Sequence, residues 1–119
     1  MDADAAIQLI QQVCRAVPPE RRRSAKSFHD AIDFALVQHG WKVHREYPAL
    51  PYGLIDLVIT APLRVAIELD RFAPREKSLR KLGRFDGLRV VVLREGRGGR
   101  YRRGDVTVIE CGQPRRGSA

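Results

Sequence analysis

The chain has 119 residues, 44% of them hydrophobic, which is enough for one compact domain with a core but too few for two domains of ordinary size. Its 22 lysines and arginines outnumber 14 aspartates and glutamates, giving a formal net charge of +8. No stretch approaches the roughly 18 apolar residues of a membrane helix, and the acidic start is unlike a secretory signal. We therefore expect no membrane contact and a cytoplasmic location.

Arginine carries most of the positive charge, with 18 arginines against 4 lysines. A planar guanidinium binds phosphate through two parallel hydrogen bonds, so this balance favours a nucleic-acid partner. The alternative is that the arginine content only reflects a GC-rich genome. Cys14 and Cys111 lie far apart and form no C-x-x-C pair, so we expect two reduced thiols and neither a zinc site nor a disulfide.

The first predicted element is a helix within residues 1–17, ended by two prolines and followed by a charged linker over residues 18–26. Ser27 is expected to cap a second helix that ends at Gly40. Apolar residues recur at helical spacing in both segments: Ile7, Ile10, Val13 and Cys14 in the first, and Phe28, Ile32, Ala35 and Leu36 in the second.

Strands dominate the middle of the chain, beginning with a weakly alternating segment over Trp41–Tyr47. Two more strands flank a turn within Gly53–Arg71, and a short helix opens at Pro74. The apolar run Leu88–Leu93 suits a buried strand parallel to the one that ends at Asp70. A loop and a last strand complete a domain over residues 27–112, before a basic tail over residues 113–119.

This order predicts an α/β fold with a mixed sheet of four to five strands, flanked by helices, and an extra N-terminal helix. Side chains alternate faces along a strand, so Ile55, Leu57 and Ile59 should share one apolar face. The opposite face then collects three acids, Asp56, Glu68 and Asp70, beside apolar residues that indicate partial cover by the helix beginning at Ser27.

Clustered carboxylates are costly, since two of them about 6 Å apart repel by roughly 3 kcal/mol at an effective dielectric constant of about 20. A divalent cation shared by Asp56, Glu68 and Asp70 would remove that cost, and oxygen ligands suit Mg²⁺ or Mn²⁺. The alternative is a solvent-facing side on which the charges are screened.

These residues resemble the PD-(D/E)XK nuclease superfamily, a restriction-endonuclease-like group, and "IELD" is similar to small very-short-patch-repair-like endonuclease domains. The matching residues are Asp56 in "GLIDLVI", Glu68 in "VAIELD" and Asp30 in the preceding helix. The resemblance implies an αβββαβ core that hydrolyses DNA with a metal held by Asp56, Glu68 and the Leu69 carbonyl. Asp70 would be a third ligand or an outer base.

The chain departs from the superfamily at Asp70, where lysine is usual and orients or deprotonates water. Lys77 in the following helix is the candidate replacement, and the alternative, which the sequence favours, is that Lys77 lies on a solvated or phosphate-contacting face. On a helical wheel Lys77 and Lys81 point away from Leu79 and Leu82. Expected nucleic-acid contacts are Arg71, Arg75, Lys77, Arg80, Lys81, Arg100, Arg102 and Arg103.

Three functions stay open on the sequence alone. The first is a magnesium-dependent DNA endonuclease, which as a homodimer could cut both strands. The second is a nucleic-acid-binding protein that has kept the nuclease fold without catalysis. The third is a protein-interaction module whose acidic face receives a basic partner.

Overall fold

The computed structural model describes residues 1–112, and the basic tail expected over residues 113–119 lies outside the described part. Its sheet has the strand order β1-β2-β3-β4-β6-β5, so the predicted α/β class with a mixed sheet is confirmed, whereas the sheet has six strands and not the predicted four to five. In chain order the elements are α1 (Ala3–Ala16), the 3₁₀ helix η1 (Pro19–Arg22), α2 (Ala25–Gln38), β1 (Lys42–Pro48), β2 (Leu54–Ala61), β3 (Val65–Asp70), α3 (Glu76–Gly83), β4 (Leu88–Leu93), β5 (Arg100–Arg103) and β6 (Val106–Glu110).

The sixth strand is β5, which occupies part of the segment expected to be a loop. It pairs antiparallel with β6, with Arg103 opposite Val106, so only Gly104 and Asp105 connect the two strands. Gly104 has φ +60, a backbone conformation that suits a two-residue hairpin. The Gly-Asp pair was the available signal, but the charged strand before it has no apolar alternation to reveal it.

The rest of the sheet follows the expected pattern. Strands β1, β2 and β3 pair antiparallel, whereas β3, β4 and β6 are parallel. The connection through α3 makes β3 and β4 parallel neighbours, as the sequence predicts. The carboxyl ends of β3, β4 and β6 therefore lie at the same edge of the sheet.

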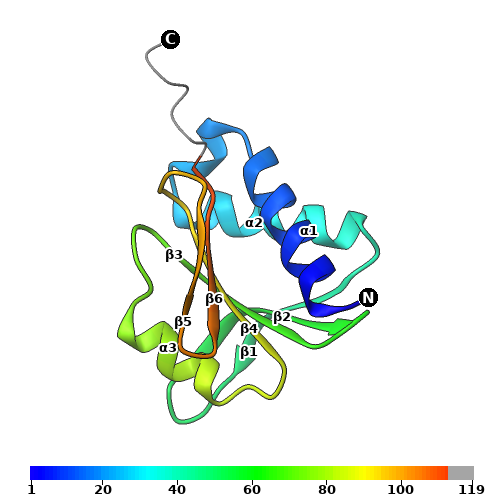
Figure 1. Cartoon of the computed structure of the whole chain (residues 1–119), viewed down its shortest axis with the longest axis vertical. Helices are drawn as coiled ribbons and strands as arrows, with labels where there is room; N and C mark the ends of the chain where they lie inside the picture. Colours follow the sequence, from blue (N-terminus) through cyan, green and yellow to red (C-terminus); the bar gives the residue numbers. More distant parts are fainter. Residues whose placement is uncertain (113–119) are drawn as a thin grey trace.

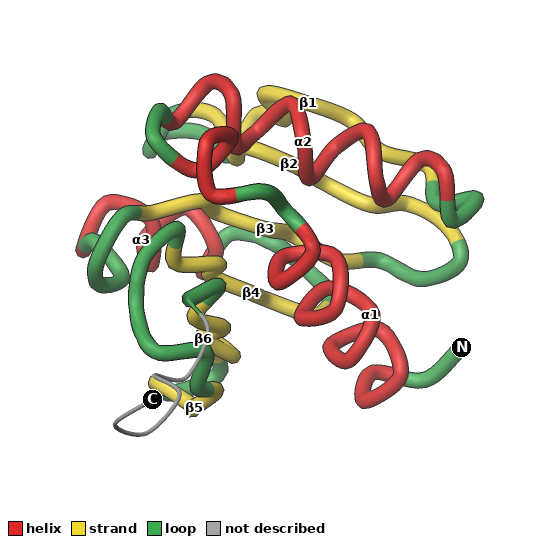
Figure 2. The backbone as a smooth tube through the Cα atoms, turned by 90° about the horizontal axis from the view of Figure 1, so that it is seen from above, coloured by secondary structure: helices red, strands yellow, loops and turns green. Residues whose placement is uncertain are grey.

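Helices cover both faces of the sheet, as Figures 1 and 2 show. On one face α1 and α2 pack on residues such as Leu57 and Ile67, and on the other α3 packs on residues such as Val58 and Ala66. Every residue of β3 is buried as a result. The acids Glu68 and Asp70 in that strand are therefore enclosed by α3, and the expectation that α2 covers them is wrong.

The regular alternation expected along β2 fails at one position. Ile55 belongs to the core under α3 with Val58, and not to the core that contains Leu57. Strand β1 is irregular opposite this point, because Glu46 has φ +55 between the pairs that contain Arg45 and Tyr47. The change of backbone direction turns the side chains on either side of Asp56 to different faces.

The start of α2 also differs from the prediction. Ser24, and not Ser27, is the N-cap, since the Ser27 N–H donates to the Ser24 hydroxyl oxygen at 3.1 Å. The helix therefore begins three residues earlier than the sequence predicted, at Ala25. The linker between α1 and α2 therefore ends earlier than predicted, and it contains η1.

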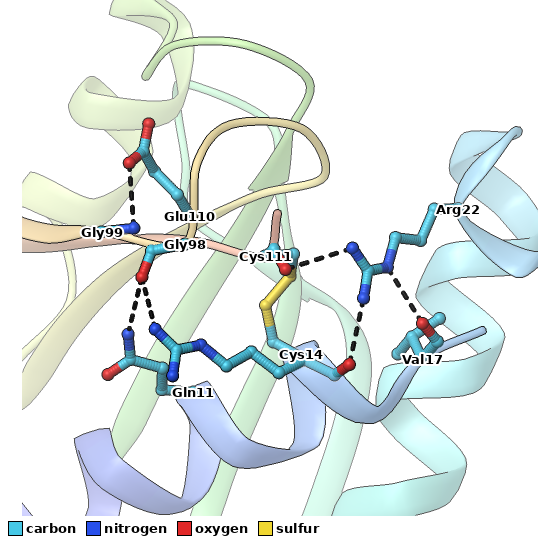
Figure 3. Close-up of a disulfide and its surroundings, with 9 residues drawn as sticks. Gln11, Cys14, Val17, Arg22, Gly98, Gly99, Glu110 and Cys111 are labelled. Atoms are coloured by element: carbon cyan, nitrogen blue, oxygen red, sulfur yellow. Dashed lines mark hydrogen bonds between the residues drawn. A yellow bond between two sulfur atoms is a disulfide. The ribbon is translucent and has the colours of Figure 1, made fainter. Parts of the chain in front are cut away.

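The two cysteines form a disulfide, so the expectation of reduced thiols is wrong (Figure 3). Cys14 and Cys111 are 97 residues apart in sequence, but their Cα atoms are 5.2 Å apart because α1 packs beside the end of β6. The cytoplasmic location stays a prediction and loses the support of free thiols. Among residues 1–112, no helix combines the length and apolar character needed to cross a membrane.

Candidate active site

Asp56 and Glu68 lie side by side where β2 and β3 stop pairing. The last recorded pair of these strands is Leu57 with Ile67. Beyond it, the Asp56 N–H donates to Glu68 Oε2 at 2.7 Å, and the Leu69 N–H donates to Asp56 Oδ2 at 2.8 Å. Each carboxylate therefore accepts a backbone N–H of the neighbouring strand, which fixes both acids in one place.

Glu68 is the more deeply buried of the two acids. Its side chain is fully buried, whereas Asp56 is half-buried. Burial raises the pKa of Glu68, and the neighbouring negative charge of Asp56 raises it further. Lys81 opposes both effects, since it stabilises the ionised form of Glu68.

Lys81 enters this site from α3. Its Nζ lies 2.6 Å from Glu68 Oε1 and donates to the Leu54 carbonyl oxygen at 2.8 Å. The side chain is only 7% exposed. Lys81 thus places an ammonium group directly beside the Glu68 carboxylate.

The helical-wheel prediction for Lys81 is therefore wrong. It centred the buried face of α3 on Leu79 and Leu82, but the helix buries Ser78, Lys81 and Leu82, and Leu79 is only partly buried. Rotation of the helix about its axis turns Lys81 toward β3. Lys77, the sequence-based candidate, is exposed, and Lys81 is the lysine that contacts Glu68.

Asp70 is engaged by the start of α3. Its fully buried carboxylate accepts the Arg75 N–H at 3.0 Å, the Arg75 Nε at 2.7 Å and the Ser78 hydroxyl at 3.0 Å. These bonds hold the segment that leads into the helix, and the same pairing raises the pKa of Arg75. The structure thus assigns Asp70 contacts separate from the pair formed by Asp56 and Glu68.

Asp30, the third acid of the resemblance, is partly exposed on α2. It pairs with Arg45 at 2.6 Å and with Lys26 at 3.4 Å, and the hydrogen bond from Arg45 lowers the pKa of Asp30. The adjacent His29 is half-buried, and burial lowers its pKa while the charge of Asp56 acts in the opposite direction. Sequence spacing gave no sign that the charge of Asp56 acts on His29.

The expected nucleic-acid contacts fall into separate groups. Lys77 and Arg80 are exposed on α3, and Arg75 is bound to Asp70. The β5 arginines are exposed at the edge of the sheet, and two strands, β4 and β6, lie between β5 and β3. Lys81 is the exception, because it is buried in the site.

The oxygen atoms that could hold a divalent ion at this site belong to Asp56 and Glu68. Within residues 1–112, Glu68 Oε1 is the one buried side-chain oxygen or nitrogen that makes no hydrogen bond, since its contact with Lys81 is an ion pair outside hydrogen-bond angles. The same part of the chain holds no group of three or more His, Cys, Asp or Glu side chains arranged for a metal. Mg²⁺ commonly uses one or two carboxylates and several waters, so two acids are sufficient ligands.

Comparison of the chain with protein-family models, with curated proteins and with solved structures found no match. The resemblance to the PD-(D/E)XK superfamily stays a prediction from its motif residues. The functional argument therefore depends on the geometry of Asp56, Glu68 and Lys81.

Proposed function

We propose that this chain is a divalent-metal-dependent endonuclease that hydrolyses phosphodiester bonds in DNA. One observation carries the proposal: Lys81 is held 2.6 Å from Glu68, and Glu68 is hydrogen-bonded to the backbone of Asp56. Two acids and a lysine are the groups that the sequence resemblance implies. The lysine comes from α3 and not from β3.

Each residue has a distinct role in the proposed reaction. Asp56 and Glu68 supply oxygen ligands, and their backbone hydrogen bonds keep them oriented. A divalent cation bound there would polarise the phosphate and make water acidic enough to ionise near neutral pH. Lys81 orients the attacking water through its ammonium group, and the exposed cations of α3 bind the flanking strand.

A nucleic-acid-binding protein without catalysis is the second candidate, and one observation favours it. Lys81 already neutralises Glu68, and Arg75 already neutralises Asp70. The cost of burying these acids is thus offset by the chain itself, without a metal. In this candidate the two ion pairs are structural, and the positive surface binds DNA.

Cleavage of supercoiled plasmid in the presence of Mg²⁺ or Mn²⁺ separates the two candidates. For the nuclease, Asp56→Asn removes cleavage and Lys81→Arg lowers the rate about 100-fold or more, because the larger, planar guanidinium keeps the charge but cannot hold the water in the position that the ammonium group gives it. Lys77→Arg is the matched control, since this exposed lysine lies one helical turn before Lys81.

Circular dichroism and thermal melting must show that each variant is folded. Equal cleavage by the wild type and Asp56→Asn would contradict the nuclease proposal. DNA binding without metal-dependent cleavage by the wild type would support the second candidate.

A further inference from the structure

A pocket of about 470 Å³ lies beside the carboxyl ends of β3 and β4. Four arginines and one glutamate contribute to its lining: Arg22, Arg23, Arg71, Arg94 and Glu95. We call this the arginine pocket. Its arginines come from three separate segments of the chain, η1 and its C-cap, the end of β3, and the end of β4. Only the tertiary structure brings these charges together.

The walls of the arginine pocket are fixed by hydrogen bonds. Arg22 donates to the carbonyl oxygens of Val17, Cys111 and Arg15, at 3.0, 3.1 and 3.0 Å (Figure 3). Arg94 donates from Nη1 to the Arg22 carbonyl oxygen at 3.0 Å, and its backbone N–H donates to the carbonyl oxygen of Asp70. A ligand would therefore enter a site whose cationic walls are already held in place, which lowers the entropic cost of binding.

Several donors in the pocket remain available. Within residues 1–112, the guanidinium of Arg23 has no hydrogen-bond or ion-pair partner, and Arg71 pairs with Glu95 through Nε. Each guanidinium has five N–H donors, and a single glutamate can balance only one of the four arginines. Like charges held together in this way favour a bound anion, and guanidinium groups match the oxygens of phosphate.

We infer that the arginine pocket binds a phosphate group of a nucleic-acid strand. The inference rests on the proposed function and adds a contact to it. Arg71 directly follows Asp70, and the Arg94 N–H donates to the Asp70 carbonyl oxygen at 2.8 Å, two residues along β3 from Glu68. The pocket and the acid pair therefore lie at the same end of the sheet. A strand that places one phosphate at Asp56 and Glu68 can place another in the arginine pocket.

Binding without cleavage tests this inference independently of the nuclease activity. Fluorescence anisotropy with a labelled DNA oligonucleotide, single-stranded or duplex, is measured in EDTA over a series of salt concentrations. Arg23→Ala should weaken binding several-fold and reduce the slope of log affinity against log salt by about one. The double variant Arg23→Ala with Arg71→Ala should reduce this slope by about two. Lys42→Ala is the control, because this exposed cation begins β1 at the opposite end of the sheet.

The outcomes separate the pocket from the proposed function. Loss of affinity in the arginine variants, with Lys42→Ala close to the wild type, supports the pocket even if no cleavage occurs. Equal effects at Lys42 and Arg23, or no effect at Arg23 and Arg71, overturn it even if the plasmid is cut. Titration with inorganic phosphate distinguishes a nucleic-acid phosphate from a free phosphate ion as the ligand. If inorganic phosphate perturbs Arg71 and Arg23 in NMR spectra but no oligonucleotide binds, a small anion is the ligand and the inference is wrong.

Discussion

The Nζ of Lys81 lies 2.6 Å from Oε1 of Glu68, and both side chains are enclosed between α3 and β3. This pairing explains how an apolar strand can contain an ionised glutamate. The two charges balance one another, the Asp56 N–H donates to Glu68 Oε2, and Lys81 donates to the Leu54 carbonyl oxygen. Removing either partner alone should therefore have a large effect.

Lys81→Met is expected to destabilise the fold by about 3–5 kcal/mol, because it leaves the carboxylate of Glu68 buried without its cation. Lys77→Met should change stability by less than about 0.5 kcal/mol, since Lys77 is exposed. Urea unfolding of both variants gives the comparison. The double variant Glu68→Met with Lys81→Met should recover most of the loss, and a double variant as unstable as Lys81→Met would refute the ion-pair explanation.

Asp70→Ala should cost about 2 kcal/mol, because the Arg75 N–H and the buried Ser78 hydroxyl lose their acceptor. The first turn of α3 should exchange its amide hydrogens faster than in the wild type. Hydrogen exchange followed by NMR measures this, with the exposed Asp86→Ala as control. Unchanged protection of α3 in Asp70→Ala would show that Asp70 does not hold the helix.

Glu68 should make stability depend on pH in a defined direction. Its pKa is raised above the usual value of 4.5, so the folded protein binds more protons at this site than the unfolded chain between the two pKa values. The contribution to stability is full below about pH 4.5 and is lost as pH rises through the folded pKa. On acidification the unfolding free energy of the wild type should therefore rise relative to that of Glu68→Gln. A relative fall for the wild type would contradict the raised pKa.

The disulfide should contribute about 4–5 kcal/mol, the value expected from chain entropy for a closed loop of about 100 residues. Reduction with dithiothreitol should lower the urea midpoint, and the variant Cys14→Ser with Cys111→Ser should lower it by a similar amount without reductant. Thiol titration of the unfolded, unreduced protein is the direct check. Two free thiols in that titration would show that the bond does not form in solution.

Local patterns in the sequence were sufficient to predict the order of the main elements. Helical spacing predicted α1 and α2, and the apolar run of β4 with its preceding helix predicted the parallel pair of β3 and β4. The proximity of Asp56 and Glu68 also followed from the sequence, since neighbouring antiparallel strands of matched polarity fix their own register. These features depend on residues close in sequence or on one strand pairing.

Other features were decided by tertiary packing alone. The rotation of α3 placed Lys81, and not Lys77, beside Glu68, and the docking of α1 brought Cys14 to Cys111. The irregular backbone at Glu46 and Asp56 moved Ile55 to the other core. A long side chain can reach several neighbours, and separation along the chain does not determine distance in space. Which lysine meets the acids therefore depends on how a whole helix packs on the sheet.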